Sequence, residues 1–578
     1  MAIIRFRTPL RTPARVAAWL LGALLSWQAA AQADEAPARA ERYMISTANP
    51  LAARAGLEIL RAGGSAVDAA IAAQMVLNLV EPQSSGIGGG GFMLHYDAET
   101  RRVTAYDGRE TAPAAVTPEL FLDADGAPLA WWDAVIGGRS VGVPGLLSML
   151  ALAQRDHGRL PWRRLFARAI DLAETGFVVS PRLHELIAGA KGLDTFEAAR
   201  DYFFTPDGMP LAIGARRANP AFATTLRTIA REGVAPFYEG AIAADIVAAV
   251  RRARRNPGAM TAEDMAGFDA RALEPVCADY RVWRVCGMGP PSSGAVATLQ
   301  TLGILNAFDL AALAPGSADA VHLISEASRL AFADRARYLA DDTFVDVPVR
   351  GLLDPDYLAR RAALIDTARS MGTAEAGEPP WREGRLADPG DGQEGLSTSH
   401  LSVVDAAGNA VSMTTSIESA FGSRLMVRGF MLNNQLTDFS FRPAVDGVPV
   451  ANRVEPGKRP RSSMAPTVVL DGAGKLVLVV GSPGGSRIIG YVVQALIARL
   501  DWGLDMQRAL SLPHHVNRNG PTDLEAATDL ASIEADLASR GHEVRQRKMT
   551  SGLHAIAVTD DGLEGGADPR REGVALGD

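Results

Sequence analysis

Helical segments on both sides of antiparallel strand hairpins are the feature of this sequence that most constrains its fold. Apolar residues recur at helical spacing over 50–61 and 66–80, and a strand hairpin over 92–107 follows them. Two more hairpins, over 400–416 and 467–480, are followed by a helix over 487–500. Because every helix and sheet must bury its apolar face against a neighbour, such elements stack in layers. The pattern predicts an α+β fold, a four-layer αββα sandwich.

Between these segments the character of the chain changes twice. Residues 144–364 are mostly helical by pattern, whereas 370–397 are polar and rich in turn residues, which predicts a linker or exposed loop. Ser65 follows two helix-breaking glycines and is placed to cap the helix over 66–80.

Composition is that of an ordinary folded protein. Of the 578 residues, 47% are hydrophobic and 21% charged, which argues against a disordered, collagenous or coiled-coil chain. Lys and Arg number 58 against 66 Asp and Glu, so the net charge is −8. This balance argues against a general nucleic-acid-binding surface.

The N-terminus has the pattern of an export signal. Several arginines precede a short apolar core over 16–27, and Ala31-Gln32-Ala33 forms a small-x-small cleavage site. We therefore predict a signal peptide over 1–33; an uncleaved anchor is the alternative. No later stretch reaches the ~20 apolar residues that a membrane span needs. The mature protein is expected to be soluble and periplasmic or secreted.

Common metal and nucleotide motifs are absent. The sequence has no P-loop and no H-E-x-x-H, and no carboxylate stands at ligand spacing from His514-His515, so no metal site is predicted. Its two cysteines, Cys277 and Cys286, are too few for a thiolate cage. Either a disulfide across a hairpin or two separate thiols fits their spacing.

One junction suggests a nucleophile. The polar linker ends at a predicted strand that begins near Thr398. If the chain were cut before Thr398, this residue would carry both a hydroxyl and an α-amine of pKa about 7.7–8.0, and the amine could take the hydroxyl proton. The same hydroxyl could make the cut through an N-to-O acyl shift. The alternative is an ordinary strand start, because hydroxyl residues begin many strands.

Two other segments offer groups that would complete such a site. Gly484 and Gly485 stand at the start of the helix over 487–500, where bare backbone N–H groups suit an oxyanion. Arg459-Pro460-Arg461-Ser462-Ser463 places two hydroxyls beside basic residues, as a carboxylate site would. A simple turn is the alternative reading of each.

These residues belong to a longer set of motifs through which the chain resembles the γ-glutamyltransferases, also called glutathione hydrolases. The resemblance covers nearly all of the predicted mature chain. The matching stretches, in order, are 82–92 (PQSSGIGGGGF), 107–113 (DGRETAP), 140–145 (SVGVPG), 290–294 (PPSSG), 398–400 (TSH), 432–435 (LNNQ), 438–440 (DFS), 458–464 (KRPRSSM) and 481–486 (GSPGGS).

The resemblance implies an N-terminal-nucleophile hydrolase fold made as a proenzyme. Self-cleavage would leave a large subunit, 34–397, and a small catalytic subunit, 398–578, joined as a heterodimer. It implies no cofactor and no metal. The site residues that it implies are the nucleophile Thr398, the supporting hydroxyl of Ser416, the oxyanion hole of Gly484 and Gly485, the α-carboxylate site of Arg109, Ser462 and Ser463, and the α-amine site of Gln435 and Asp438.

Three departures from the family bear on the substrate. Glu418 stands where well-known members have asparagine, and we expect it to face the substrate ammonium with Asp438. Ser416 replaces the usual threonine. The segment 441–457 is shorter than the lid of some bacterial members and lacks their tyrosine.

The predicted function is cleavage of the γ-glutamyl amide of glutathione and related compounds through a γ-glutamyl-threonine intermediate. Water or an amino acid or peptide acceptor would then resolve the intermediate. An amidase or cephalosporin (glutaryl) acylase of the same fold is the first alternative, although Asp438 would have no α-amine to bind in such substrates. A second alternative is an inactive periplasmic binding protein on this fold.

Overall fold

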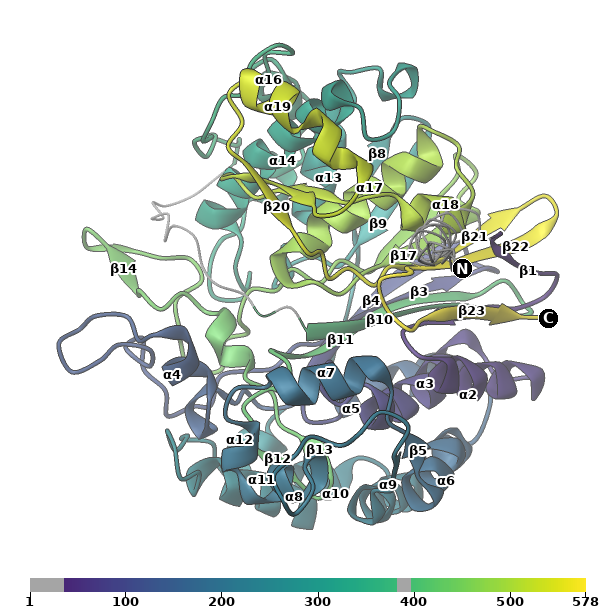
Figure 1. Cartoon of the computed structure of the whole chain (residues 1–578), viewed down its shortest axis with the longest axis vertical. Coiled ribbons are helices and arrows are strands. Elements are labelled where there is room, and N and C mark those ends of the chain that lie inside the picture. The colour runs from purple at the N-terminus through teal and green to yellow at the C-terminus, as the bar shows by residue number, and fades with distance from the viewer. Residues whose placement is uncertain (1–35, 382–394, 396) are drawn as a thin grey trace, which may run out of the picture.

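Two seven-stranded antiparallel sheets lie face to face between two groups of helices in the computed structural model, which describes residues 36–381, 395 and 397–578 (Figure 1). This arrangement confirms the predicted α+β class and its four layers. The predicted signal peptide, most of the linker before Thr398 (382–394) and Leu396 lie outside the described residues.

The lower sheet of Figure 1 carries the predicted nucleophile. Its strand order is β23-β2-β10-β11-β3-β4-β7, so β10 lies in the interior of the sheet between β2 and β11. Its strands are β2 (Met44–Thr47), β3 (Gly90–Asp97), β4 (Arg102–Gly108), β7 (Arg271–Leu273), β10 (Ser397–Val404), β11 (Ala410–Glu418) and β23 (Val574–Gly577).

The upper sheet has the order β1-β22-β21-β17-β16-β9-β8. Its strands are β1 (Ala38–Ala40), β8 (Val276–Tyr280), β9 (Trp283–Gly287), β16 (Thr467–Leu470), β17 (Leu476–Gly481), β21 (His554–Thr559) and β22 (Gly562–Ala567). Short strands outside the two sheets are β5 (Phe177–Val178), β6 (Arg216–Arg217), β12 (Met426–Val427), β13 (Phe430–Met431), β14 (Ala444–Val445), β15 (Val448–Pro449), β18 (His515–Asn517), β19 (Thr522–Glu525) and β20 (Val544–Arg547).

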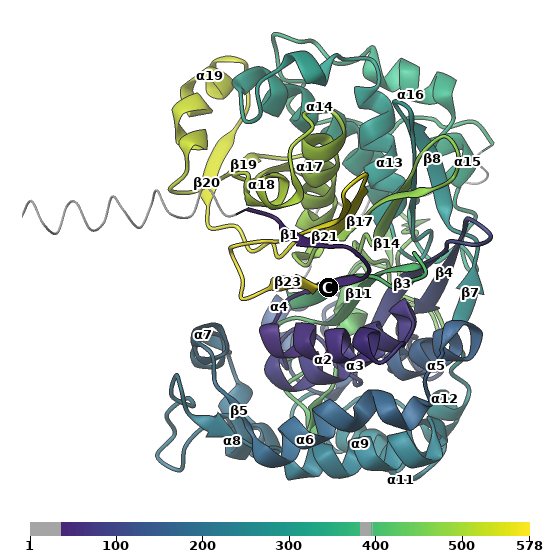
Figure 2. The same cartoon turned by 90° about the vertical axis from the view of Figure 1, so that its right-hand side faces the viewer.

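Helices form the two outer layers, which Figure 2 shows below and above the strands. Below lie α2 (Pro50–Arg61), α3 (Ala66–Val80), α4 (Trp131–Val135), α5 (Leu146–His157), α6 (Ala167–Thr175), α7 (Pro181–Gly189), α8 (Glu197–Phe203), α9 (Pro220–Glu232), α10 (Ala235–Tyr238), α11 (Ala241–Arg251) and α12 (Ala262–Ala266). Above lie α13 (Gly294–Leu305), α14 (Ala318–Tyr338), α15 (Val349–Leu352), α16 (Pro355–Ala362), α17 (Ile488–Leu500), α18 (Met506–Ser511) and α19 (Glu534–Ser539).

Strand residues alternate between two apolar cores. Ile45 and Met93 lie in the core that the lower sheet shares with α2 and α3. Their neighbours Met44 and Phe92 lie in the core that also holds the upper sheet and α13, α14 and α17. This alternation follows from the two-residue period of a strand. Both faces of the lower sheet are therefore buried along its central strands, whereas residues of the edge strands β7 and β23 are partly exposed.

Helix α3 shows how closely local signals match this architecture. All its residues are buried. Ser65 Oγ accepts a hydrogen bond from the N–H of Asp68 at 3.1 Å, and the Asp68 carboxylate accepts one from the N–H of Ser65 at 3.0 Å. This capping box satisfies backbone donors that the first turn leaves unpaired. The predicted cap is confirmed.

The two cysteines pair across the hairpin of β8 and β9. Cys277 and Cys286 are direct partners in the strand register and form a disulfide. Of the two readings that the sequence left open, the structure has the disulfide. The disulfide lies at the outer edge of the upper sheet, because β8 pairs only with β9 among the described strands.

In the part of the chain that the structure describes, no helix combines the length and the apolar character that crossing a bilayer requires.

Candidate active site

Thr398 lies in β10 at an irregular point of its pairing with β11. Ser397 pairs with Glu418 and Ser399 with Thr415, so two residues of β11 stand opposite Thr398. Such a bulge re-aims the side chain next to it, and bulges are common beside active sites. The Thr398 side chain is buried and lines a cavity at the end of the strand.

The hydroxyl of Ser416 connects the predicted nucleophile with the bond before it. Ser416 Oγ donates to the carbonyl oxygen of Ser397 at 2.9 Å and accepts from the N–H of Glu418 at 2.8 Å. Because a carbonyl only accepts, the Ser416 proton points at Ser397. Thr398 Oγ1 lies 3.3 Å from Ser416 Oγ and therefore acts as the donor of that pair. Ser416 thus polarises the Ser397 carbonyl and orients the Thr398 hydroxyl.

Gly484 and Gly485 begin the helical segment that runs into α17. Gly485 lines the cavity with Thr398 and starts a 3₁₀ turn that precedes the α-helix, rather than the α-helix itself. Gly484 has φ +138°, and a Cβ there would lie 2.7 Å from the ring of Tyr491. Only glycine fits this position. The first N–H groups of a helical segment have no carbonyl of a preceding turn to bond, so they are available to an anion.

Arg109 is fully buried and lines the same cavity as Thr398. Its Nε donates to the carbonyl of Pro460 at 3.0 Å, and its Nη2 donates to the carbonyl of Arg461 at 3.0 Å and to Asp438 Oδ2 at 2.5 Å. Among the described residues its Nη1 has no hydrogen-bond partner, although Glu110 Oε2 lies 3.7 Å away. Nη1 is thus the nitrogen of this guanidinium whose hydrogen bonds the described residues leave unused.

Glu418 ends β11 with its backbone in the left-handed region, at φ +78°. A non-glycine residue seldom adopts this conformation, which is typical of functional sites. Its carboxylate accepts from Ser419 Oγ at 2.7 Å, from Asn434 Nδ2 at 3.0 Å and from the N–H of Gly395. Asp438 is held by Gln435 Nε2 at 3.0 Å. The two carboxylates thus meet in one cavity.

The crowding of buried carboxyl groups raises their pKa values. Burial raises the pKa of Glu418 well above its usual range, and the negative charge of Asp438 raises it further. Burial also raises the pKa of Glu110 to about 8, against the opposing effect of Arg109. The crowding therefore disfavours the ionised form of Glu418 in the empty site, and a bound cation would lower its pKa.

The two serines after Arg461 are held by neighbouring elements. Arg335 of α14 donates to Ser463 Oγ at 2.6 Å, and Ser462 Oγ accepts from the N–H of Met464 at 3.1 Å. Both serines line the same cavity.

One cavity brings the predicted residues together. All of them line it except Gly484, which directly precedes Gly485. The lining residues are Arg109, Gly395, Thr398, Ser416, Glu418, Gln435, Asp438, Ser462, Ser463, Met464, Gly485 and Ile488.

Sequence reasoning missed several residues that hold this site. Arg571 Nη1 donates to the carbonyl of Thr398 at 2.9 Å, although the two lie far apart in the chain. Arg335 and Asn434 hold Ser463 and Glu418. No local pattern marks Arg571 or Arg335. Asn434 and Glu110 lie inside matched motifs, and their position next to predicted residues was the available signal.

The stacked sheets, with a buried threonine where an interior strand begins and an oxyanion-type glycine pair beside it, define an enzyme of the N-terminal-nucleophile hydrolase type. The model of the Gamma-glutamyltranspeptidase family matches residues 52–578. The chain belongs to this family.

Individual relatives and a solved structure agree with that assignment. The glutathione hydrolase proenzyme of Bacillus subtilis (strain 168) is 37% identical over 546 residues, which are 92% of this chain and 91% of that protein. Acylase ACY 1 proenzyme of Pseudomonas sp. (strain SE83) is 36% identical, over 94% of this chain and 95% of that protein. The crystal structure of cephalosporin acylase from Bacillus halodurans has a TM-score of 0.83 at 29% identity, covering 94% of this chain and 97% of that one.

Proposed function

We propose that this enzyme hydrolyses and transfers the γ-glutamyl group of glutathione and related amides. The observation that carries the proposal is that Arg109, Asp438 and Glu418 line the cavity of Thr398 together. Arg109 Nη1 is available to a carboxylate, and Asp438 and Glu418 beside it form an acidic pair suited to an ammonium. A γ-glutamyl group carries both charges on one carbon, and its amide carbonyl lies a short aliphatic chain away.

In the proposed reaction Thr398 has been freed as an N-terminus. Its α-amine takes the hydroxyl proton while Oγ1 attacks the γ-carbonyl carbon. The N–H groups of Gly484 and Gly485 stabilise the oxyanion, and the amine product leaves with a proton. Water or the amino group of an acceptor then attacks the γ-glutamyl-threonine ester, and Thr398 is regenerated.

The same hydroxyl would release its own amine. Thr398 Oγ1 attacks the Ser397 carbonyl, which Ser416 already polarises at 2.9 Å, and the resulting ester is hydrolysed. We propose that residues 1–33 are removed on export. The cut between Ser397 and Thr398 then leaves the subunits 34–397 and 398–578. In the uncut chain the N–H of Gly395 donates to Glu418, where the substrate ammonium would bind. The cut therefore also clears the acidic pair.

The first test compares two anilides that differ only in the α-amine. We expect kcat/KM to be about tenfold to a hundredfold higher for γ-glutamyl than for glutaryl anilide, because a charge-assisted hydrogen bond is worth about 1.5–3 kcal/mol. Glutathione should be consumed with release of Cys-Gly, with and without an acceptor dipeptide. Faster turnover of the glutaryl anilide would instead favour the acylase alternative, which the acylase relatives raise.

Glu418→Gln tests whether Glu418 reads the amine. Glutamine keeps the shape but loses the charge, so KM for γ-glutamyl anilide should rise roughly tenfold or more, with a smaller change in kcat. Because the pKa of Glu418 is raised in the empty site, the wild-type KM should fall as pH rises toward that pKa, and the variant should lose this dependence. Turnover of glutaryl anilide should stay level or improve. An unchanged ratio between the two substrates would mean that Glu418 does not contact the amine.

A further inference from the structure

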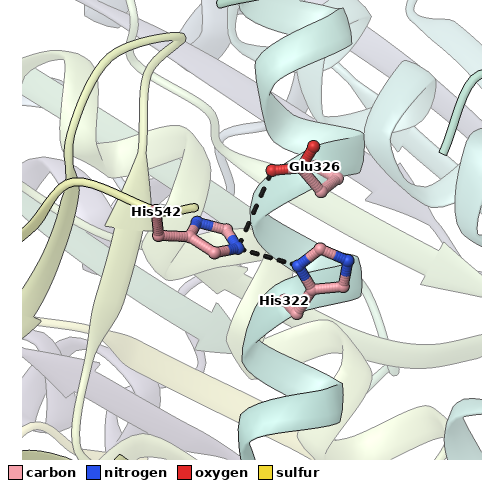
Figure 3. A group of neighbouring side chains, drawn as sticks. All are labelled: His322, Glu326 and His542. Atoms are coloured by element: carbon pink, nitrogen blue, oxygen red, sulfur yellow. Dashed lines mark hydrogen bonds and ion pairs between the residues drawn. The ribbon is translucent and has the colours of Figure 1, made fainter. Parts of the chain in front are cut away.

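A second group of buried polar side chains lies outside the cavity of Thr398. His322 and Glu326 stand one turn apart on α14, and His542 reaches them from the segment between α19 and β20 (Figure 3). His322 Nδ1 lies 2.7 Å from His542 Nε2, and Glu326 Oε1 lies 3.9 Å from the same nitrogen. One ligand-type atom from each residue thus points at a common centre.

Outer hydrogen bonds orient both imidazoles toward that centre. His322 Nε2 lies 2.8 Å from the carbonyl oxygen of Asp366, which only accepts, so Nε2 carries the proton and Nδ1 has its lone pair turned inward. His542 Nδ1 lies 3.0 Å from Thr522 Oγ1 and 3.4 Å from Arg329 Nη2, which only donates, so without a metal ion Nδ1 accepts and Nε2 gives its proton to His322 Nδ1. A bound metal ion would displace this proton, and Nδ1 would then carry one toward Thr522 Oγ1. Metal-binding histidines usually bond their second ring nitrogen in this way.

Glu326 is oriented just as firmly. Its Oε1 accepts from Arg329 Nε at 2.8 Å and from Ser370 Oγ at 2.7 Å, and its Oε2 accepts from the N–H of Met371 at 2.7 Å. The Ser370 hydroxyl can rotate and release Oε1. Arg329 Nη1 also donates to the carbonyl of Gly520 at 2.7 Å. Once the Ser370 hydroxyl turns away, Oε1 keeps only the hydrogen bond from Arg329 and has a lone pair for a metal ion.

We propose that His322, Glu326 and His542 bind one divalent transition-metal ion of the zinc type. Two imidazoles and a carboxylate are a borderline donor set that suits Zn²⁺, whereas Ca²⁺ and Mg²⁺ prefer oxygen ligands alone. At metal–ligand distances of about 2.0–2.1 Å a tetrahedral site spaces its ligand atoms about 3.3 Å apart. The imidazole nitrogens, now 2.7 Å apart, need only small ring rotations, and water would complete the site.

The site would join the two proposed subunits. His322 and Glu326 belong to the segment before Thr398, and His542 belongs to the segment after it. Around them Val321 of α14 packs with Leu524, Leu530 and Leu537 in a small apolar cluster. An ion here would therefore clamp α14 to the C-terminal part of the chain. This clamp role rests on the proposed processing, whereas ion binding itself does not.

The test uses untagged full-length protein that has been treated with EDTA and dialysed. We expect wild type to bind about one Zn²⁺ per chain in competition titrations, and Co²⁺ to give the visible absorption of a low-coordinate nitrogen–oxygen site. His322→Gln and His542→Gln should weaken Zn²⁺ binding at least about a hundredfold. His184→Gln is the matched control, because His184 lies on α7, outside the cluster, with its Nδ1 bonded to Leu211. It should bind as wild type does.

Two further measurements separate the ion from the processing. Thr398→Ala protein, which should stay uncut, is expected to bind Zn²⁺ as tightly as wild type. In processed wild type, EDTA should lower the urea concentration at which the subunits part, because an ion that binds only the folded state stabilises it. Absence of saturable Zn²⁺ binding and of a Co²⁺ spectrum in wild type, or equal binding by wild type and both histidine variants, would overturn the proposal. The cluster would then be a metal-free hydrogen-bonded histidine pair.

Discussion

Thr398→Ala should yield an undivided chain without γ-glutamyl activity. Alanine keeps the β10 backbone but removes the hydroxyl that would attack both the Ser397 carbonyl and the substrate. We expect one band on a denaturing gel and a loss of turnover of at least about a thousandfold, as removal of a covalent nucleophile typically causes. Terminal sequencing of the smaller wild-type band should begin at Thr398.

Ser399→Ala is the matched control for this change. Ser399 is the next residue of the same strand, and its buried Oγ has no hydrogen-bond partner among the described residues. Its loss should leave cutting and turnover near the wild-type level. A small subunit that begins elsewhere, or an active preparation made only of intact chain, would show that Thr398 is not the processing nucleophile.

Arg109→Lys should reduce kcat/KM for γ-glutamyl anilide by about a hundredfold or more. Lysine brings a point charge, whereas Arg109 holds two backbone carbonyls and Asp438 and still presents Nη1. Losing one or two charge-assisted hydrogen bonds to the substrate α-carboxylate, at about 1.5–3 kcal/mol each, accounts for this loss. The measurement is steady-state turnover of the γ-glutamyl anilide by both proteins.

A matched substrate and a control variant distinguish binding from structure. 4-Aminobutyryl anilide lacks the α-carboxylate, so its turnover should change little in Arg109→Lys. Arg284→Lys, which alters an exposed arginine paired with Asp279, should affect neither substrate. Equal losses on both anilides in Arg109→Lys would mean that Arg109 chiefly supports Asp438 and the Pro460–Arg461 turn.

Local elements of this fold were predictable because their signals are local. Apolar spacing located α2 and α3 at the bounds that the structure has, and the cap of α3 was also predicted. The hairpins of the two sheets were expected within a residue or two at most ends, but β10 begins at Ser397 and β11 continues to Glu418. The start of α17 was predicted one residue early, because the first turn after Gly484 is a 3₁₀ turn.

The pairing of strands that lie far apart in the chain has no local sequence signal. The C-terminal strand β23 joins the lower sheet beside β2, and β1 joins the upper sheet beside β22. Periodicity shows that a segment can be a strand but does not name its partner. The same holds for the hydrogen bond from Arg571 to Thr398, which joins residues 173 positions apart.

By itself the sequence determined the layered fold and, through the order of its motifs, the family, and it predicted the site residues and their chemistry, because helix and strand periods and motifs are read along the chain. Only the tertiary structure decided how these groups meet. It turned Glu418 toward Asp438 through a left-handed backbone, set the Ser416 hydroxyl on the Ser397 carbonyl and brought His542 to α14. His322 and Glu326 stand four residues apart in the sequence, which is one helical turn, but nothing in the sequence links His542 to them. Distances between side chains depend on how sheets and helices pack, and packing joins residues that no local pattern connects.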